Sequence, residues 1–122
     1  GAARTVDRII DAFPMNQQDQ IRTQLSVSIV AVISQLLLPK ANVEGRIAVF
    51  EIMLCTPAIS HMIRENKTFR ITSSIQTGGK LGMRTMDSSL QELYTKGLIE
   101  YDDMVAMSSD SEEIEGKVKN RG

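Results

Sequence analysis

The lone histidine and the lone cysteine are the first residues to consider for chemistry. His61 is the only histidine of the 122-residue chain, and Cys55 is its only cysteine. A zinc site needs several such ligands, and nucleophilic catalysis needs a base and a third orienting group beside the nucleophile. We therefore expect no metal site and no catalytic residue. Cys55 is interpreted as a small buried hydrophobe that follows a strand, and His61 as a residue on a helix surface.

Two glycine–lysine pairs are the candidates for a phosphate-binding loop. Such a loop ends in Gly-Lys followed by Ser or Thr, whose hydroxyl binds magnesium. Gly79-Lys80 is followed by Leu81, and Gly116-Lys117 is followed by Val118. Neither pair supplies the hydroxyl, so we expect no nucleotide cofactor in this segment and interpret the glycines as turn residues.

Acidic residues argue against two further site classes. The carboxylates of Asp102-Asp103 and Glu112-Glu113 are adjacent in sequence, so on a helix they point in different directions and do not form an acid–base pair. A helix-turn-helix over 88–107 lacks the basic face that DNA binding requires, because four acidic residues there outnumber Lys96. Nucleic acid is therefore not an expected partner.

One segment, 58–65, remains a candidate functional surface. An apolar stripe is followed there by charged residues at the end of an expected helix: Ala58, Ile59, Met62 and Ile63, then Arg64 and Glu65. Two interpretations stay open at this point. The helix either docks its apolar face in the core with solvated charges, or it presents a contact surface to a partner.

The composition indicates the kind of domain that carries these residues and the compartment in which it works. The chain is 42% hydrophobic and 24% charged, which at this length predicts one compact domain. Its 14 basic and 15 acidic residues give a net charge of −1, so we expect no strong electrostatic field of a single sign at its surface. The apolar stretches 29–38 and 47–54 are far shorter than the roughly 20 residues of a membrane helix. With one cysteine and no secretory leader, we expect a reducing cytosol and no membrane insertion.

The first half of the chain is predicted to be two helices and a strand pair. A helix over 2–10 should bury Val6, Ile9 and Ile10 and end at Phe13-Pro14. The helical pattern at the very first residues suggests truncation upstream. With Asn16 as N-cap, a long buried helix should follow, on the apolar repeat Ile21, Leu25, Ile29, Ile33 and Leu37. Residues 36–38 are equally compatible with a short strand, and we expect 36–40 to pair with a buried strand over 46–54.

The second half is predicted to be helical. Thr56 and Pro57 should start a short helix that ends near residue 66, and 67–76 should form another with Phe69, Ile71 or Thr72, and Ile75 inward. Asp87 or Ser88 should cap a helix that stops at Gly97 in a Schellman motif with Leu98. A last helix is expected over 102–107, and the charged stretch 108–122 should be a loosely held helix or tail without a core role.

Several segments together resemble a known family. The stretches 3–11, 24–26 with 31–35, 45–53, 56–59, 74–78 and 82–90 follow, in order, the pattern of the C-terminal part of PilT-type twitching-motility ATPases. In this family the segment matching 58–65 is a signature, Ala-Ile-Arg-Asn-Leu-Ile-Arg-Glu, associated with pilus retraction. Ala58, Ile59, Ile63, Arg64 and Glu65 keep that pattern, whereas Ser60, His61 and Met62 replace its central residues.

The resemblance implies a fold and a function. The fold is α/β but mostly helical: the end of a RecA-like P-loop ATPase sheet over 1–54, a helical C-terminal region over 55–107, and a charged tail over 108–122. The parent would be a hexameric, cytoplasmic motor at the pilus base, peripheral to the inner membrane. It would use ATP and magnesium bound upstream and contact the inner-membrane platform proteins. Lacking Walker A and Walker B motifs, this segment alone would not be catalytic. A free-standing helical interaction module and a pilus-assembly or secretion ATPase are the alternatives.

Overall fold

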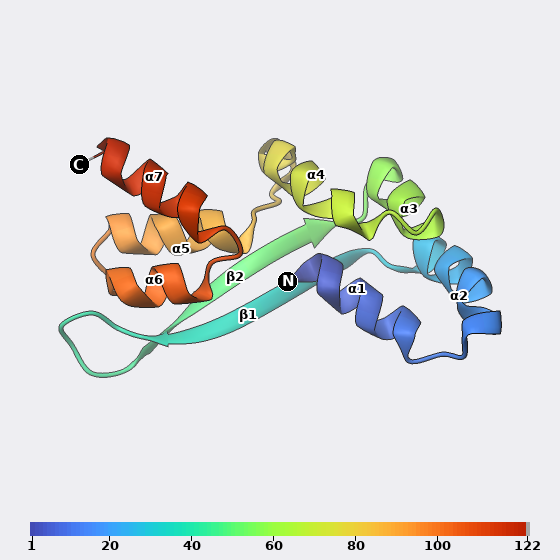
Figure 1. Cartoon of the computed structure of the whole chain (residues 1–122), viewed down its shortest axis with the longest axis horizontal. Helices are drawn as coiled ribbons and strands as arrows, with labels where there is room; N and C mark the ends of the chain where they lie inside the picture. Colours follow the sequence, from blue (N-terminus) through green and yellow to red (C-terminus); the bar gives the residue numbers. More distant parts are fainter. Residues whose placement is uncertain (122) are drawn as a thin grey trace. The chain divides into compact units, whose positions relative to one another are not determined.

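The computed structural model describes residues 1–121, with the side chains of 1–118. Helices dominate, and the sheet consists of β1 and β2, joined by a short loop (Figure 1). In chain order the elements are α1 (Ala2–Asp11), α2 (Met15–Ser28), β1 (Ala31–Pro39), β2 (Arg46–Leu54), α3 (Pro57–Arg64), η1 (Thr68–Arg70), α4 (Ile71–Thr77), η2 (Gly79–Leu81), α5 (Met86–Thr95), α6 (Tyr101–Met107) and α7 (Ser111–Arg121).

The chain divides into two compact units that alternate along the sequence. The first unit comprises Gly1–Ser34 and Glu51–Arg84, and the second comprises Gln35–Phe50 and Thr85–Gly122. Both strands of the hairpin therefore contribute residues to both units. The functional division at residues 54 and 107 stays a prediction, because these compact units are defined by packing alone.

The core of the first unit is built from aliphatic residues spaced by four. Helix α1 buries three residues at this spacing, and α3 and α4 bury one pair each, because residues four apart lie on one face of a helix. Together with one residue from β2 and one from the loop before α5, they form one cluster: Ala2, Val6, Ile10, Met53, Ile59, Ile63, Ile71, Ile75 and Met83. The expected inward position of Ile9 is wrong, since its side chain is 39% exposed.

The predicted long helix over 16–37 is wrong. Helix α2 ends at Ser28, and 31–39 form strand β1, along which exposed and half-buried residues alternate. Four of the five residues 29–33 are β-branched, which favours a strand, and pairing with β2 satisfies backbone groups along one edge of β1. The expected pairing of 36–40 with 46–54 is confirmed in a longer form. Asn16 is not the cap of α2: Pro14 occupies that position, and the Gln18 side-chain amide donates to the Phe13 carbonyl at 3.0 Å.

The predicted helix over 67–76 is split. Thr68–Arg70 form the 3₁₀ turn η1 before α4 begins at Ile71. Ile71 and Ile75 are buried as expected, but Phe69 is 75% exposed rather than inward. The tighter turn rotates each residue further than an α-helix does, so the spacing that placed Phe69 in the core does not hold across η1.

The second unit has a core that the strands and three helices share. Its buried residues are Leu38, Val49, Met86, Leu90, Ile99, Met104 and Ile114. Helix α5 is capped by Thr85, whose hydroxyl accepts from the Ser88 amide at 3.1 Å, and not by Asp87 or Ser88 as expected. The expected Schellman end is confirmed. Gly97 has φ 75°, and the amide of Leu98 donates to the Leu93 carbonyl at 2.9 Å.

The charged stretch after residue 108 does contribute to the core, contrary to expectation. It forms α7, in which Ile114 is 2% exposed and belongs to the buried cluster of the second unit. The Asp87 carboxylate accepts from the amides of Ser109 at 2.7 Å and Asp110 at 3.0 Å, just before α7 begins. Ile114, the half-buried Val118 packed against the same cluster, and the Asp87 carboxylate thus dock a helix whose composition is otherwise that of a tail.

Candidate functional site

Helix α3 carries the candidate surface, and its start is fixed by local signals. The Thr56 hydroxyl accepts from the Ile59 amide at 3.3 Å, and Pro57 occupies the first helical position. Proline there sets the helical φ and costs no hydrogen bond. The expected start of this helix is confirmed, so the chain enters α3 in a defined direction.

The end of α3 is fixed by a left-handed residue. Asn66 has φ 59°, the Lys67 amide donates to the Met62 carbonyl at 2.7 Å, and the Asn66 amide donates to the Ile63 carbonyl at 3.3 Å. These two bonds form a Schellman motif. Asparagine tolerates the left-handed region better than other residues with a side chain, which allows the helix to end directly after Glu65.

The inner face of α3 anchors it in the first unit. Ile59 and Ile63 are fully buried. Met62 is half-buried, and the Ser74 hydroxyl lies 3.7 Å from its sulfur. Ala58 is exposed, so its expected place on the buried stripe is wrong. Of the five residues that match the family signature, two therefore form the anchor and three face solvent.

The exposed end of α3 holds a guanidinium between two partners. Arg64 Nη2 lies 3.0 Å from His61 Nδ1, and Arg64 Nε lies 3.5 Å from Glu65 Oε1. Because a guanidinium can only donate, Nδ1 is the acceptor in this contact. The side chains of Arg64 and Glu65 stay 43% and 49% exposed. An exposed pair contributes at most about 1 kcal/mol to stability, so its main effect is to restrict the orientations open to the Arg64 side chain.

Ser60 joins α3 to the preceding helix, a role that sequence reasoning missed. Its hydroxyl donates to the Ser26 carbonyl at 2.6 Å, in the last turn of α2. Carbonyls in a last helical turn lack intrahelical partners, so this bond satisfies a group that would otherwise need water. Because α2 was expected to continue past Ser28, no free carbonyl was foreseen at Ser26.

Of the two other candidate residues, His61 lies on this surface and Cys55 does not. His61 is exposed on α3, as expected, and Cys55 is half-buried after β2. Burial raises the pKa of the Cys55 thiol, which keeps it protonated and weakly nucleophilic. Within 1–121, no group of three or more histidine, cysteine or acidic residues is placed to hold a metal ion. No helix in this part of the chain is long and apolar enough to cross a membrane.

Comparison with known proteins gives relatives of one kind. No protein-family model matches the chain. The chain is 52% identical over 99 residues to a twitching motility protein of Neisseria gonorrhoeae, covering 81% of the chain and 26% of that protein. It is 50% identical over 98 residues to the type IV pilus retraction ATPase PilT of Pseudomonas aeruginosa, covering 80% of the chain and 28% of that protein. The chain thus spans little more than a quarter of these relatives.

A solved structure extends the similarity to the fold. The crystal structure of the pilus retraction motor PilT with bound ADP superposes with a TM-score of 0.79 at 40% identity, over 93% of this chain and 31% of that one. The match includes both compact units, since it covers nearly the whole chain. The mostly helical architecture with its small sheet is therefore that of the C-terminal part of a RecA-like ATPase.

Proposed function

The chain belongs, over the segment that it spans, to the PilT-type ATPases of twitching motility, and from this premise we propose that the whole protein is a motor that retracts type IV pili. The observation that carries the proposal is the construction of α3. Ile59 and Ile63 anchor it, a motif fixes each end, and Arg64 and Glu65 stand exposed.

In this proposal, α3 transmits movement to the pilus machinery. A helix fixed by buried residues moves with its unit as a rigid element, whereas surface charges on a loop would yield under load. The oriented guanidinium of Arg64 and the carboxylate of Glu65 would contact the platform proteins of the inner membrane. The protein would act in the cytoplasm, peripheral to that membrane at the pilus base.

The nucleotide chemistry of the proposed motor lies outside this segment. The solved PilT structure holds ADP, and we propose that the whole protein likewise binds ATP with magnesium, through parts that this chain does not include. It would assemble as a homo-oligomer, a hexameric ring. An ATPase assay on this chain tests the assignment: no turnover is expected, and robust magnesium-dependent hydrolysis would refute it.

A double variant tests the role of α3. In the whole protein, Arg64→Ala with Glu65→Ala should leave ATP binding intact and strongly reduce twitching, because the buried anchor of the helix is unchanged. The matched control is Glu44→Ala with Arg46→Ala, which removes an exposed charge pair of the second unit and should leave twitching intact. Normal twitching of the α3 variant would show that its charges are merely solvated.

A further inference from the structure

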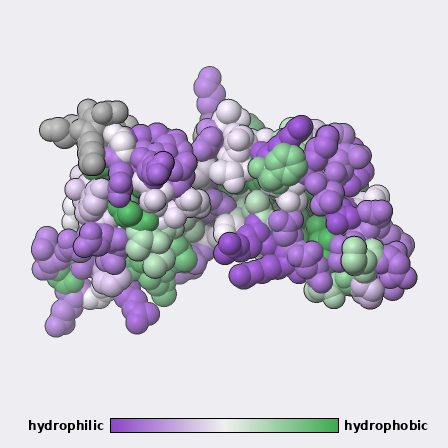
Figure 2. All heavy atoms as spheres, viewed as in Figure 1, coloured by the Kyte–Doolittle hydropathy of each residue, from purple (hydrophilic) through white to green (hydrophobic). Residues whose placement is uncertain are grey.

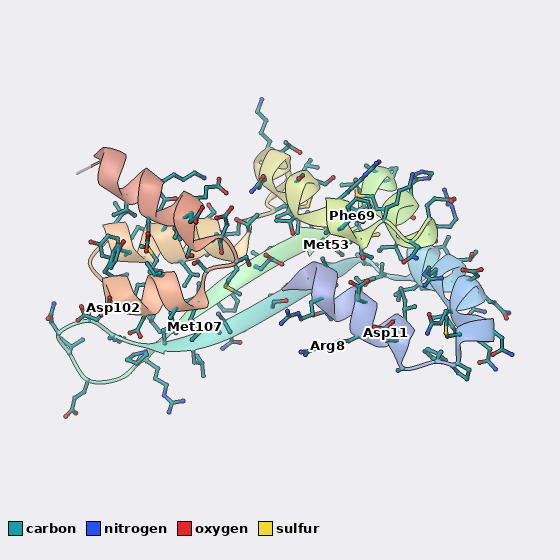
Figure 3. The ribbon with its side chains drawn as sticks, in the orientation of Figure 1. Arg8, Asp11, Met53, Phe69, Asp102 and Met107 are labelled. Carbon is teal, nitrogen blue, oxygen red and sulfur yellow. The ribbon has the colours of Figure 1, made fainter. Side chains whose placement is uncertain are left out.

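Phe69 is an exposed aromatic residue without an assigned role. It retains 75% exposure, the largest value for any aromatic side chain within 1–118, and lies on the turn between α3 and α4 (Figure 3). The guanidinium carbon of Arg70 lies 5.5 Å from the centroid of its ring, within cation–π range. Aromatic residues, phenylalanine among them, and arginine are enriched at protein–protein interfaces relative to the rest of the surface.

The backbone that carries Phe69 is held from both sides. The Thr68 hydroxyl donates to Asp7 Oδ1 of α1 at 2.7 Å, and Thr68 is 7% exposed. On the other side, the Arg70 amide donates to the Lys67 carbonyl at 3.0 Å. A group that is already ordered loses little entropy on binding. We name Lys67, Phe69 and Arg70 together the Phe69 surface.

The two units carry opposite charge. The first has eight basic and five acidic residues, a net +3, while the second has six basic and ten acidic, a net −4; together these give the −1 of the whole chain. Near the Phe69 surface, Asp7 bonds Thr68, and Glu65 pairs with Arg64. Lys67 and Arg70 remain as the cations of the turn itself.

The second unit offers a surface of complementary chemistry on α6. Glu100 and Asp102 are exposed at its start, Asp103 is half-buried, and Met107 is 46% exposed at its end. Asp103 and Met107 are four residues apart and share a helix face. Figure 3 labels Asp102 and Met107 on α6, and Figure 2 shows hydrophobic residues bordered by hydrophilic ones on the visible surface. We name these four residues the α6 surface.

We propose that the Phe69 surface of one copy binds the α6 surface of a second copy. Lys67 and Arg70 would face Asp102 and Asp103, and the Phe69 ring would contact the Met107 thioether, a favourable sulfur–aromatic pair. Two Phe69 surfaces do not pair with each other, since like charges would meet. The contact is therefore head-to-tail and repeats from copy to copy, as in a ring or an open chain. The inference rests on the proposed homo-oligomer and names surfaces that form it.

Charge reversal in solution tests this contact. The first variant carries Lys67→Glu and Arg70→Glu, and the second carries Asp102→Lys and Asp103→Lys. Sedimentation velocity should show that the unmodified protein self-associates, that added salt weakens the association, and that each variant raises its dissociation constant at least about tenfold. Circular dichroism establishes that both variants are folded.

Mixing distinguishes this contact from general charge effects. Each variant keeps one intact surface, so the two variants should associate with each other in equal amounts although each by itself associates only weakly. A variant with all four reversals should associate again, because the charges are complementary once more. As a local probe, Phe69→Cys in one copy and Met107→Cys in another should form an intermolecular disulfide under mild oxidation.

Three results would overturn the proposal: a monomeric protein at all concentrations, association that the reversals leave unchanged, or failure of the mixture and the four-fold variant to associate.

If the reversals abolish twitching but leave assembly unchanged, the Phe69 surface binds another protein and the proposal is wrong. The association measurements use purified protein without pili, and the α3 double variant is not involved in them. Failure of one proposal is thus distinguishable from failure of the other.

Discussion

The two compact units hold their helices in different ways. In the first, side chains from one element bond to another element: Ser60 to the Ser26 carbonyl, and Thr68 to Asp7. In the second, the Ser89 hydroxyl of α5 likewise donates to the Phe50 carbonyl of β2 at 2.5 Å. There, however, a side chain from a distant position also fixes the point where a helix starts, since Asp87 accepts two amides ahead of α7.

The difference indicates what each unit is built to do. Ser60 lies within α3 and Thr68 just beyond it, so the bonds of the first unit enclose the segment that carries Arg64 and Glu65. The surface is thereby preorganised before any partner binds. The bonds of the second unit instead complete its own core, and its exposed acidic helices are the part left for contacts.

Truncation of one buried side chain in each unit should give the largest effect. Ile63→Ala in the first and Met104→Ala in the second remove residues that are fully buried, so each should cost about 2–5 kcal/mol. Urea unfolding followed by circular dichroism measures this. If both variants shift one shared transition, the units unfold together; two transitions, each moved by one variant, would mean that they unfold separately. Val30→Ala, at a side chain 80% exposed, should change stability by less than about 0.5 kcal/mol.

Removal of the carboxylate before α7 should be next in size. Asp87→Ala breaks two charge-assisted bonds to backbone amides, and we expect a loss of about 2 kcal/mol. Hydrogen exchange should show faster exchange at Ser109 and Asp110. Glu44→Ala, at an exposed loop position, is the control. Unchanged protection of both amides would show that the apolar contacts of Ile114 and Val118 alone dock the helix.

The ends of α3 and α5 allow a matched test across the units. Asn66 has φ 59° and Gly97 has φ 75°, each in a Schellman motif. Asn66→Ala and Gly97→Ala should each cost about 1–2 kcal/mol, because alanine is strained in the left-handed region. Asn66→Gly should be neutral or stabilising. Thermal melts measure all three, and a loss confined to one helix would show that the two ends are not equivalent.

The bond between α3 and α2 should give the smallest effect on stability. Ser60→Ala removes the hydrogen bond to the Ser26 carbonyl, at a cost of about 1 kcal/mol. The whole protein should twitch less, since α3 loses one restraint beside Arg64. Ser73→Ala, at an exposed position of α4, is the control for both readouts. Full twitching at reduced stability would separate the bond from function.

Local motifs were predictable from the sequence. Thr56-Pro57 at the start of α3 and Gly97-Leu98 at the end of α5 act through neighbouring residues, and both are confirmed. The β-strand over 46–54 is confirmed as well, because its β-branched and apolar residues extend over the whole segment. The segment 58–65 stood out first by its apolar stripe and terminal charges and then by the family resemblance, whereas the exposure of Ala58 followed only from the structure.

The predictions that failed concern features that are decided by contacts between residues far apart in the sequence. The apolar run after Ser28 fits both a helix and a strand, and its partner β2 decides for the strand. Ser60 bonds to a carbonyl 34 residues away, and Asp87 reaches amides 22 and 23 residues away. Helix α7 has one fully buried apolar residue, Ile114, within the part whose side chains are described, too few for a periodic signal. Spacing along the chain carries no information on such contacts.

The alternation of the two units along the chain has a consequence for recombination. Residues 35–50 interrupt the first unit, and 85–122 complete the second. No single crossover point can therefore exchange one unit between relatives and leave the other intact. A chimaera that replaces only 85–122 would separate Leu38 and Val49 from the helices with which they share a core. The second unit has to be transplanted as two segments at once, and any natural shuffling of this region is expected to have moved both units together.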